Sequence, residues 1–450
     1  MYEMTSAGRP TMCLAATIAA IVAIAALLAR VGADAQWLAA LGHVIARHFT
    51  IPTGIPFAAA PTSHWPNALV LAELVFDALE GTLGDRGLML AQLLAVGAAL
   101  IVLARDARAG GADAAGTSAA LLLVALGALP SLTIARVQLF SLVLFPVVLA
   151  LLRAQARRPS PRIWLVVPLL AVWSNLHGTA LLGAAVVLAY LLGSRMRREP
   201  IVAAGVGLAS LLALCLTPAL VSTVGYYHGL LTNVAVQRGQ GMWGPLSLSA
   251  PFDLLLIGAA AALVIRVPRA RPELWEWIVL AALGAISIQA SRNGVWLLFF
   301  LVGPAARAIR PTRSWQVLAG PALVASLAAI TFAVVRGPVP QGATPALLSR
   351  ALRLAHGSPV LAEDQLAEQV ALAGGRIWVG NPIDAFSKRD QGIYLDWLQG
   401  NAGGRRALNP QVRVVLVSRG SPAQALMVAA PGFTAVGGDA RTRLYVRDSS

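Results

Sequence analysis

The feature that most constrains this chain is a series of long apolar runs. A helix of about 20 apolar residues spans the hydrocarbon core of a bilayer. Runs near that length lie at 11–30, 87–104, 117–135, 137–152, 163–176, 177–193, 200–217, 246–265, 274–290, 293–309 and 315–335. Only 12% of the 450 residues are charged, whereas soluble domains have about 25%. The sequence therefore predicts a polytopic α-helical membrane protein with about eleven transmembrane helices.

Most of the net charge of +15 comes from arginines between the runs. Clusters follow alternate runs: Arg105 and Arg108; Arg153, Arg157, Arg158 and Arg162; Arg195, Arg197 and Arg198; Arg266, Arg269 and Arg271; Arg307, Arg310 and Arg313. Because cytoplasmic loops are enriched in arginine, these clusters and the N-terminus are predicted to face the cytoplasm. Segments 31–86 and 218–245, and everything after 336, then lie outside a bacterial plasma membrane. The charge indicates topology, and nucleic acid is not expected as a partner.

Two segments leave the topology open. The run 67–80 carries Glu73, Asp77 and Glu80, and we expect it not to cross; if it does cross, the second and third spans are redrawn. The first run resembles a signal peptide, but no clean cleavage site follows it, so we interpret it as an uncleaved span.

The last quarter of the chain differs in composition and pattern. Short β-like runs at 375–380, 412–418 and 443–448 alternate with helical stretches, which favours a small α/β domain. Proline and glycine in "VRGPVPQGATP" mark a linker. We predict a transmembrane domain over 1–336, a linker over 337–345 and an extracytoplasmic domain over 346–450.

Asp34 stands at the outer end of the first run, where an unpaired charge is costly. The stretch 35–48 has apolar residues at helical spacing, which predicts an amphipathic helix on the membrane surface with Trp37 at headgroup depth. Asp34 would then lie at the entrance of a cavity that this helix covers. The alternative is that Asp34 only caps the N-terminus of the helix.

Other polar and aromatic residues share the predicted outer face. They are His64 and Trp65 in the first loop, Arg136 and Gln138, Asn175 and His177, Trp243, and Arg292. Each taken alone is more often an interface anchor or a turn residue. Together they suit a lipid-linked anionic substrate, because an arginine binds phosphate, a carboxylate can activate a hydroxyl and aromatic faces suit sugar rings.

Several other functions lack their usual signals. The sequence has no phosphate-binding Gly-Lys-Ser/Thr loop, no HExxH helix and no cysteine pair with metal spacing. Its two cysteines, Cys13 and Cys215, lie inside apolar runs and predict no disulfide. The runs also lack the charged residues that a proton-coupled transporter usually carries along its spans.

Short motifs resemble a bacterial branch of the GT-C glycosyltransferase superfamily, whose members are polytopic enzymes that use polyprenyl-phosphate-linked sugars. In the first loop these motifs are Asp34 with Trp37, His48 followed by "IPTGIPF", and "HWPN". Further along, "ARVQLFS" resembles an Arg-Pro-Gln-Leu-Phe-Ser motif, "WSNLHGTALLG" a Trp-x-Asn-x-His-Gly turn, and "SRNGVW" a later arginine motif. The motifs are spread over most of the chain.

The resemblance implies an inverting glycosyltransferase with an outward-facing site. Asp34 would be the catalytic base, and Arg136 or Arg292 would bind the lipid phosphate. Substrate contacts would come from Trp37, His64, Trp65, Gln138, Asn175, His177 and Trp243. The partners would be a polyprenyl-phosphate-linked sugar, membrane lipid, and a glycan, lipid or protein acceptor. No cofactor is predicted, and a divalent metal is left open.

Two departures from the branch bear on activity. The branch often has His-Glu-Trp after the tryptophan of the loop, but this chain reads "NALVL", and Val137 replaces the proline of the Arg-Pro-Gln motif. Either Glu73 or Asp77 replaces the missing acid, or the chain is an inactive member.

Two alternatives belong to other functional classes. The first is a non-catalytic membrane subunit that binds a partner or glycan through 380–400, where aromatic and charged residues are mixed. The ordinary interpretation of that stretch places Phe386, Tyr394 and Trp397 in a domain core. The second, ranked lowest, is a flippase or transporter of lipid-linked sugars.

Overall fold

The computed structural model describes residues 8–62, 65–309 and 319–448. His64, Arg310 and Arg313 therefore lie outside the described residues. The chain forms two compact units. The first unit comprises Met1–Arg30, Asp85–Leu216 and Gly239–Val339, and the second comprises Val31–Gly84, Thr217–Arg238 and Pro340–Ser450. The second unit thus combines two loops with the C-terminal segment. The domain boundaries at 336 and 346 stay a prediction.

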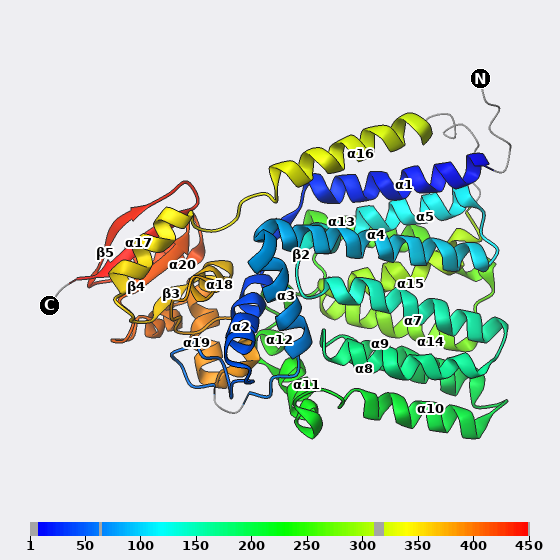
Figure 1. Cartoon of the computed structure of the whole chain (residues 1–450), viewed down its shortest axis with the longest axis horizontal. Coiled ribbons are helices and arrows are strands. Elements are labelled where there is room, and N and C mark those ends of the chain that lie inside the picture. The colour runs from blue at the N-terminus through cyan, green and yellow to red at the C-terminus, as the bar shows by residue number, and fades with distance from the viewer. Residues whose placement is uncertain (1–7, 63–64, 310–318, 449–450) are drawn as a thin grey trace. The chain divides into compact units, whose positions relative to one another are not determined.

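The first unit is a set of helices that run side by side in Figure 1. They are α1 (Gly8–Leu27), α4 (Asp85–Ala109), α5 (Ala114–Gly127), α6 (Leu129–Thr133), α7 (Leu139–Arg157), α8 (Val166–Ser174), α9 (Ala180–Tyr190), α10 (Pro200–Ala213), α13 (Pro251–Val264), α14 (Leu274–Gln289), α15 (Gly294–Ala306) and α16 (Ala319–Arg336). Strands β1 (Arg30–Val31) and β2 (Ile134–Ala135) are two residues each. Each predicted apolar run overlaps one of these helices.

Membrane-spanning character is clearest in a subset of these helices. Among the described residues, four helical segments are long and apolar enough to cross a membrane by length and composition: Asp85–Ala109, Leu139–Arg157, Pro251–Ala270 and Ala319–Arg336. Six further apolar helices are 10–17 residues long. The count of eleven spans stays a prediction.

Helix α15 lies at the centre of the first unit. Each of its residues is buried, and it packs against α4, α5, α13 and α14. A helix that is apolar on all sides is stable only inside such a bundle or in lipid. Trp296 within it contacts Phe145 of α7 at a ring distance of 5.3 Å. Aromatic contacts of this kind fill the core of the unit.

Arginines from several predicted cytoplasmic clusters meet at one place in the first unit. A cavity of about 150 Å³ is lined by Arg153, Arg157, Arg271 and Arg307, together with Asp106 and Glu276. Ser194, next to a further cluster, donates a hydrogen bond to Glu273 in the wall of the same cavity. Four clusters that the positive-inside rule places on one side of the membrane are therefore gathered together. Which side they face stays a prediction.

The second unit combines helices with a small sheet. Its helices are α2 (Ala35–His48), α3 (Val70–Leu83), α11 (Thr223–Thr232), α12 (Val234–Arg238), α17 (Pro345–Ala355), α18 (Asp364–Leu372), α19 (Lys388–Leu398) and α20 (Pro422–Val428). Its strands are β3 (Val360–Ala362), β4 (Val414–Ser418), β5 (Phe433–Gly438) and β6 (Thr442–Arg447). The sheet has the order β3-β4-β6-β5, with β3 parallel to β4 and the other pairs antiparallel.

The strands differ in part from those expected. β4 and β6 overlap the β-like runs at 412–418 and 443–448, but 375–380 forms no named strand. Ile377 instead makes isolated bridges to Ala58 of the first loop and to Val360. The apolar residues that suggested a strand there are buried between these two partners.

Helix α2 has the predicted bounds and packs closely on α3. Gly42 permits this approach, because a Cβ at that position would collide with the carbonyl group of Glu73. Only 4% of the surface of Trp37 is exposed, and its predicted depth in the membrane stays a prediction. Its indole packs against that of Trp65 with the rings edge to face at 6.3 Å. These contacts bury the Trp37 face of the helix against protein, and the location of the helix at the membrane surface stays a prediction.

Candidate functional site

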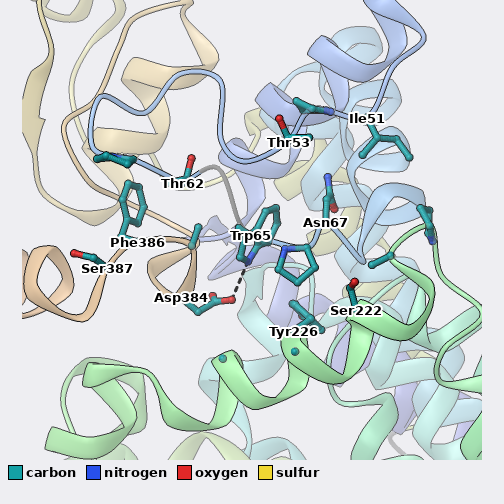
Figure 2. Close-up of a pocket in the computed structure, with 18 residues that line it drawn as sticks. Ile51, Thr53, Thr62, Trp65, Asn67, Ser222, Tyr226, Asp384, Phe386 and Ser387 are labelled. Atoms are coloured by element: carbon teal, nitrogen blue, oxygen red, sulfur yellow. Dashed lines mark hydrogen bonds between the residues drawn. The ribbon is translucent and has the colours of Figure 1, made fainter.

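A cavity in the second unit has a volume of about 980 Å³. Three segments that are far apart in sequence line it: 51–67 of the first loop, 218–229 around α11, and 384–387 of the C-terminal segment. Figure 2 shows Trp65, Asn67, Tyr226, Asp384 and Phe386 around the space. A cavity of this size and mixed lining is typical of a small-molecule site.

The first loop keeps its shape through a tight internal turn. Gly54 has a φ of 96°, in the left-handed region that favours glycine, and a Cβ there would collide with the carbonyl of Thr62. The hydroxyl of Thr62 accepts a 2.8 Å hydrogen bond from the backbone N–H of Ile55. These contacts fold 54–62 back on itself and place Trp65 at the cavity wall.

Trp65 connects the first loop to the C-terminal segment. Its indole Nε1 donates a hydrogen bond of 2.9 Å to Oδ2 of Asp384, the dashed line in Figure 2. Withdrawal from water raises the pKa of the Asp384 carboxyl, the Trp65 bond lowers it, and the charge of Asp34 raises it. Asp384 is thus a partly shielded acid in the wall, oriented by a tryptophan.

Tyr226 stands among the acids of the second unit. Burial raises the pKa of its hydroxyl well above the usual value, and the charges of Asp384, Tyr227, Asp34 and Glu73 add to the rise. An interaction of this kind requires the charges to lie near the phenol. Asp34 does not itself line the cavity, but its charge contributes to the raised pKa of two wall residues, Tyr226 and Asp384.

Glu73 is a buried acid next to a wall residue. Its side chain is fully buried, and Asn67 Nδ2 donates a 2.8 Å hydrogen bond to its Oε2. Burial raises the pKa of the Glu73 carboxyl to about 8, against a smaller lowering by Asn67. At neutral pH this carboxyl is mostly protonated, so it can orient Asn67 without adding a full negative charge.

Asp34 occupies the residue before α2, but its side chain makes no capping hydrogen bond there. The alternative that Asp34 only caps the helix was therefore wrong. Its backbone is left-handed, with φ 83°. Glu368 of α18 accepts hydrogen bonds from the backbone N–H groups of Asp34 (2.8 Å) and Gln36 (3.3 Å) instead. The side chain of Glu368 thus accepts hydrogen bonds from backbone N–H groups at the start of α2.

The predicted phosphate-binding arginines belong to the first unit. Arg292 stacks on the ring of Trp243, with its guanidinium carbon 4.6 Å from the ring centroid. The 3-10 turns η4 (Gly241–Trp243) and η6 (Ser291–Asn293) that carry them are joined by a hydrogen bond from Ser291 N to Gly244 O. The structure thus brings two predicted site residues together. Arg136 lies just before α7, close to Gln138, whose side chain is buried.

Asn175 and His177 also belong to the first unit and serve its turns. Asn175 Nδ2 donates to the carbonyl oxygens of Ala171 and Leu216. Nδ1 of the buried His177 lies 2.7 Å from Ser141 Oγ, which accepts a hydrogen bond from Trp173 Nε1. Both side chains hold α8 against its neighbours, and their predicted substrate contacts stay predictions.

Several residues of this site had not been identified from the sequence. Tyr226 and Ser222 come from a loop without a family motif, and Asn67 ends the "HWPN" motif but had been given no role in a site. Asp384 and Phe386 lie in the stretch 380–400 that had been singled out as a binding surface. Phe386, Tyr394 and Trp397 are all buried, so the core interpretation also holds for them. Phe386 is a core residue and also a residue of the cavity wall, because its side chain is buried and lines the cavity.

No described residue that lines the cavity is a lysine or an arginine. In the described part of the chain, no group of three or more His, Cys, Asp and Glu side chains is placed to hold a metal ion. The cavity is therefore aromatic and acidic, and it suits an uncharged hydroxyl-bearing ligand better than an anion.

The fold is similar to that of ArnT from Cupriavidus metallidurans. The structure of ArnT bound to undecaprenyl phosphate aligns with a TM-score of 0.54 at 14% identity over 99% of each chain. Its apo structure aligns with a TM-score of 0.50 at 14% identity over 98% of each chain. Arabinofuranosyltransferase AftD from Mycobacteria reaches 0.47 at 15% identity over 98% of this chain and 42% of that one, which is too low to argue from.

No protein-family model matches the sequence, and no curated protein matches it in sequence. The likeness to ArnT is thus one of structure. It extends over the whole chain and agrees with the motif resemblance. The chain therefore shares its fold with ArnT.

Proposed function

We propose that the chain is an inverting glycosyltransferase that moves a sugar from a polyprenyl-phosphate donor to a hydroxyl group of a glycan, lipid or protein. The observation that carries the proposal is the aromatic cavity whose wall residues Tyr226 and Asp384 feel the charge of Asp34. The fold shared with ArnT, whose structure contains undecaprenyl phosphate, supports the class of donor.

In the proposed reaction Asp34 is the general base. Its carboxylate takes the proton of the acceptor hydroxyl, and the hydroxyl oxygen attacks the anomeric carbon from the face opposite the phosphate. The bond from the anomeric carbon to the phosphate oxygen breaks, and polyprenyl phosphate leaves with the electron pair. One displacement of this kind inverts the anomeric centre, and a positioned base contributes about 10²–10⁴-fold to such a step.

The acids around Asp34 support this assignment. Glu73, whose carboxyl has a pKa of about 8, is mostly neutral at pH 7. Asp384 is held by Trp65 in the cavity wall. A site in which neighbouring carboxyls differ in protonation state is the usual arrangement for acid and base chemistry. In this scheme Asp34 is the proton acceptor, and Asp384 binds a sugar hydroxyl.

The sugar or acceptor is proposed to bind against Trp65, Tyr226 and Phe386. Aromatic faces present weakly polar surface to the C–H groups of a sugar ring, while Asn67 and Ser222 can hydrogen-bond its hydroxyls. The leaving phosphate needs a cation. Arg292, with its plane set by Trp243, is the first candidate, and Arg136 is the second.

The test is sugar transfer by the full-length protein in lipid vesicles, with radiolabelled undecaprenyl-phosphate pentoses and hexoses as donors. Asp34→Asn keeps the size of the side chain and removes its basicity, so kcat should fall by about 10²–10⁴-fold. Asp77→Asn is the matched variant, because Asp77 belongs to the same segment but pairs with His43 (3.4 Å).

Each outcome has a separate meaning. Loss in Asp77→Asn with normal transfer in Asp34→Asn would move the role of base to Asp77. Normal transfer by both variants would sink the mechanism. A wild-type protein that transfers no sugar but binds a glycan through 380–400 would favour the non-catalytic subunit.

A further inference from the structure

The C-terminal segment reaches the backbone of Asp34 through one side chain. Oε1 of Glu368 accepts hydrogen bonds from Asp34 N at 2.8 Å and from Asn381 Nδ2 at 2.7 Å, and its Oε2 accepts one from Gln36 N at 3.3 Å. Only 1% of the Glu368 surface is exposed. The carboxyl is therefore held on both sides, by the helix start and by Asn381.

These bonds matter because of the backbone conformation of Asp34. The left-handed region is unfavourable for residues other than glycine, although Asp and Asn tolerate it better than most. Asp34 adopts it with φ 83°. A strained residue keeps one orientation only where its surroundings fix it. Glu368 does so from outside the segment, because it binds the N–H of Asp34 itself.

A second consequence concerns the side chain. The exposed N–H groups at the start of a helix attract the nearest carboxylate, which is usually that of the N-cap residue. Here Glu368 fills that place, and the side chain of Asp34 makes no capping bond. The carboxylate of Asp34 is thus not used as a cap at the helix start.

We propose that Glu368 is a positioning residue for Asp34: it holds the start of α2 so that the Asp34 carboxylate points to the reacting hydroxyl. The proposal rests on the function proposed for Asp34. It gives the C-terminal segment a part in catalysis without contact between Glu368 and the substrate. Burial raises the pKa of the Glu368 carboxyl, which favours its neutral form next to Asp34.

A matched control lies on the same helix. Gln365 of α18 also binds the segment before α2, through a 2.5 Å hydrogen bond from its Nε2 to the carbonyl oxygen of Val31. Gln365→Ala removes a contact between the same two elements but leaves the N–H of Asp34 bonded. It separates the orientation of Asp34 from general docking of α18.

The first readout does not need a substrate. Hydrogen–deuterium exchange of residues 34–37 is measured in the full-length protein in lipid nanodiscs. Glu368→Ala should make exchange of these amides about 10-fold faster, because their acceptor is lost. Gln365→Ala should leave it unchanged. Unchanged exchange in Glu368→Ala would overturn the proposal, whether or not the protein transfers sugar.

The second readout is kcat and KM with the radiolabelled undecaprenyl-phosphate sugar that the wild type consumes. Glu368→Ala and the shorter Glu368→Asp should lower kcat by about 10–100-fold, with KM within about 3-fold, because a small misplacement of a catalytic group has effects of this size. Glu368→Gln keeps the length of the side chain and one acceptor oxygen, so it should retain most of the wild-type kcat.

Normal kcat in Glu368→Ala despite faster exchange would contradict the role in catalysis. Equal losses in Glu368→Ala and Gln365→Ala would also contradict it, because docking of α18 would then be the cause. A wild-type protein without any sugar transfer counts against the proposed function, and the exchange measurement still shows whether Glu368 holds Asp34.

Discussion

The two units of the chain bury acids in opposite ways. In the first unit, Asp106 and Glu276 share the buried Arg153, with Nη1 2.7 Å from Asp106 Oδ2 and Nε 3.4 Å from Glu276 Oε1. In the second unit, Glu73 and Glu368 are as deeply buried, but the hydrogen bonds described for them come from amide and backbone N–H groups.

The difference separates structural acids from reactive ones. A buried carboxylate paired with an arginine is charge-compensated and supports the packing of helices. Buried carboxyls without a cation stay mostly protonated, and such perturbed acids cluster at functional sites. By this criterion we place the proposed chemistry in the second unit, which also contains Asp34, and give the ion cluster of the first unit a structural role. Three predictions test this contrast.

The largest effect on stability is expected from breaking the ion cluster. Arg153→Met leaves Asp106 and Glu276 buried without their cation, so the free energy of unfolding should fall by about 3–5 kcal/mol. Arg157→Met is the control, because Arg157 is 41% exposed and its nearest atom is 3.8 Å from Asp106; it should change stability by about 1 kcal/mol at most. Thermal unfolding in detergent measures both. A stable Arg153→Met protein would mean that the cluster is not structural.

The second prediction concerns Glu73 and pH. Its carboxyl has a pKa of about 8 in the folded protein, above the ordinary value of 4.5. Between these values the folded protein binds more protons than the unfolded chain, so stability falls as pH rises from 4.5 to 8. The side chain in Glu73→Gln cannot ionise. The free energy of unfolding of this variant should therefore exceed that of wild type by about 1–3 kcal/mol at pH 8, and by less at pH 5.

The measurement for Glu73 is the melting temperature of wild type and Glu73→Gln at pH 5 and pH 8. Asp77→Asn, on the same helix but paired with the exposed His43, is the control and should keep the pH dependence of the wild type. If the difference between Glu73→Gln and wild type does not grow with pH, Glu73 is already ionised and the contrast between the units fails at this residue.

The smallest effect is expected where the second unit does pair an acid with an arginine. Arg238 and Asp396 form a 2.8 Å ion pair whose side chains are 36% and 26% exposed. Arg238→Ala should change the free energy of unfolding by about 0.5 kcal/mol or less, because water screens such a pair. The same melting experiment checks it. A loss as large as that of Arg153→Met would show that pairing, and not burial, decides which acids are structural.

The sequence predicted the parts of this site that depend on local pattern. The apolar spacing of 35–48 was enough to give α2 with its exact bounds, and the position of Asp34 after the first run marked it as unusual. The environment of Trp37 was not predictable in this way. A helical pattern defines an apolar face, but Trp65, which covers that face, is 28 positions later in an irregular loop.

The remainder of the site depends on contacts across the whole chain. Glu368 binds Asp34 across 334 positions, and Asp384 binds Trp65 across 319. No local propensity encodes such pairings, so Glu368 was indistinguishable from any acid on a short helix. The motif residues Asn175 and His177 were easy to find from the sequence, but their hydrogen bonds to Leu216 and Ser141 hold segments of the first unit together.

The proposed function requires a sugar to bind in the cavity lined by Trp65, Tyr226 and Phe386, with its reacting carbon within reach of Asp34. The most direct test is a cryo-EM structure of the full-length protein in nanodiscs with a non-transferable phosphonate analogue of an undecaprenyl-phosphate sugar. The account predicts sugar density against these three aromatic side chains, within hydrogen-bonding distance of Asp34 or Asp384. Sugar density at another place, with this cavity empty, would contradict it.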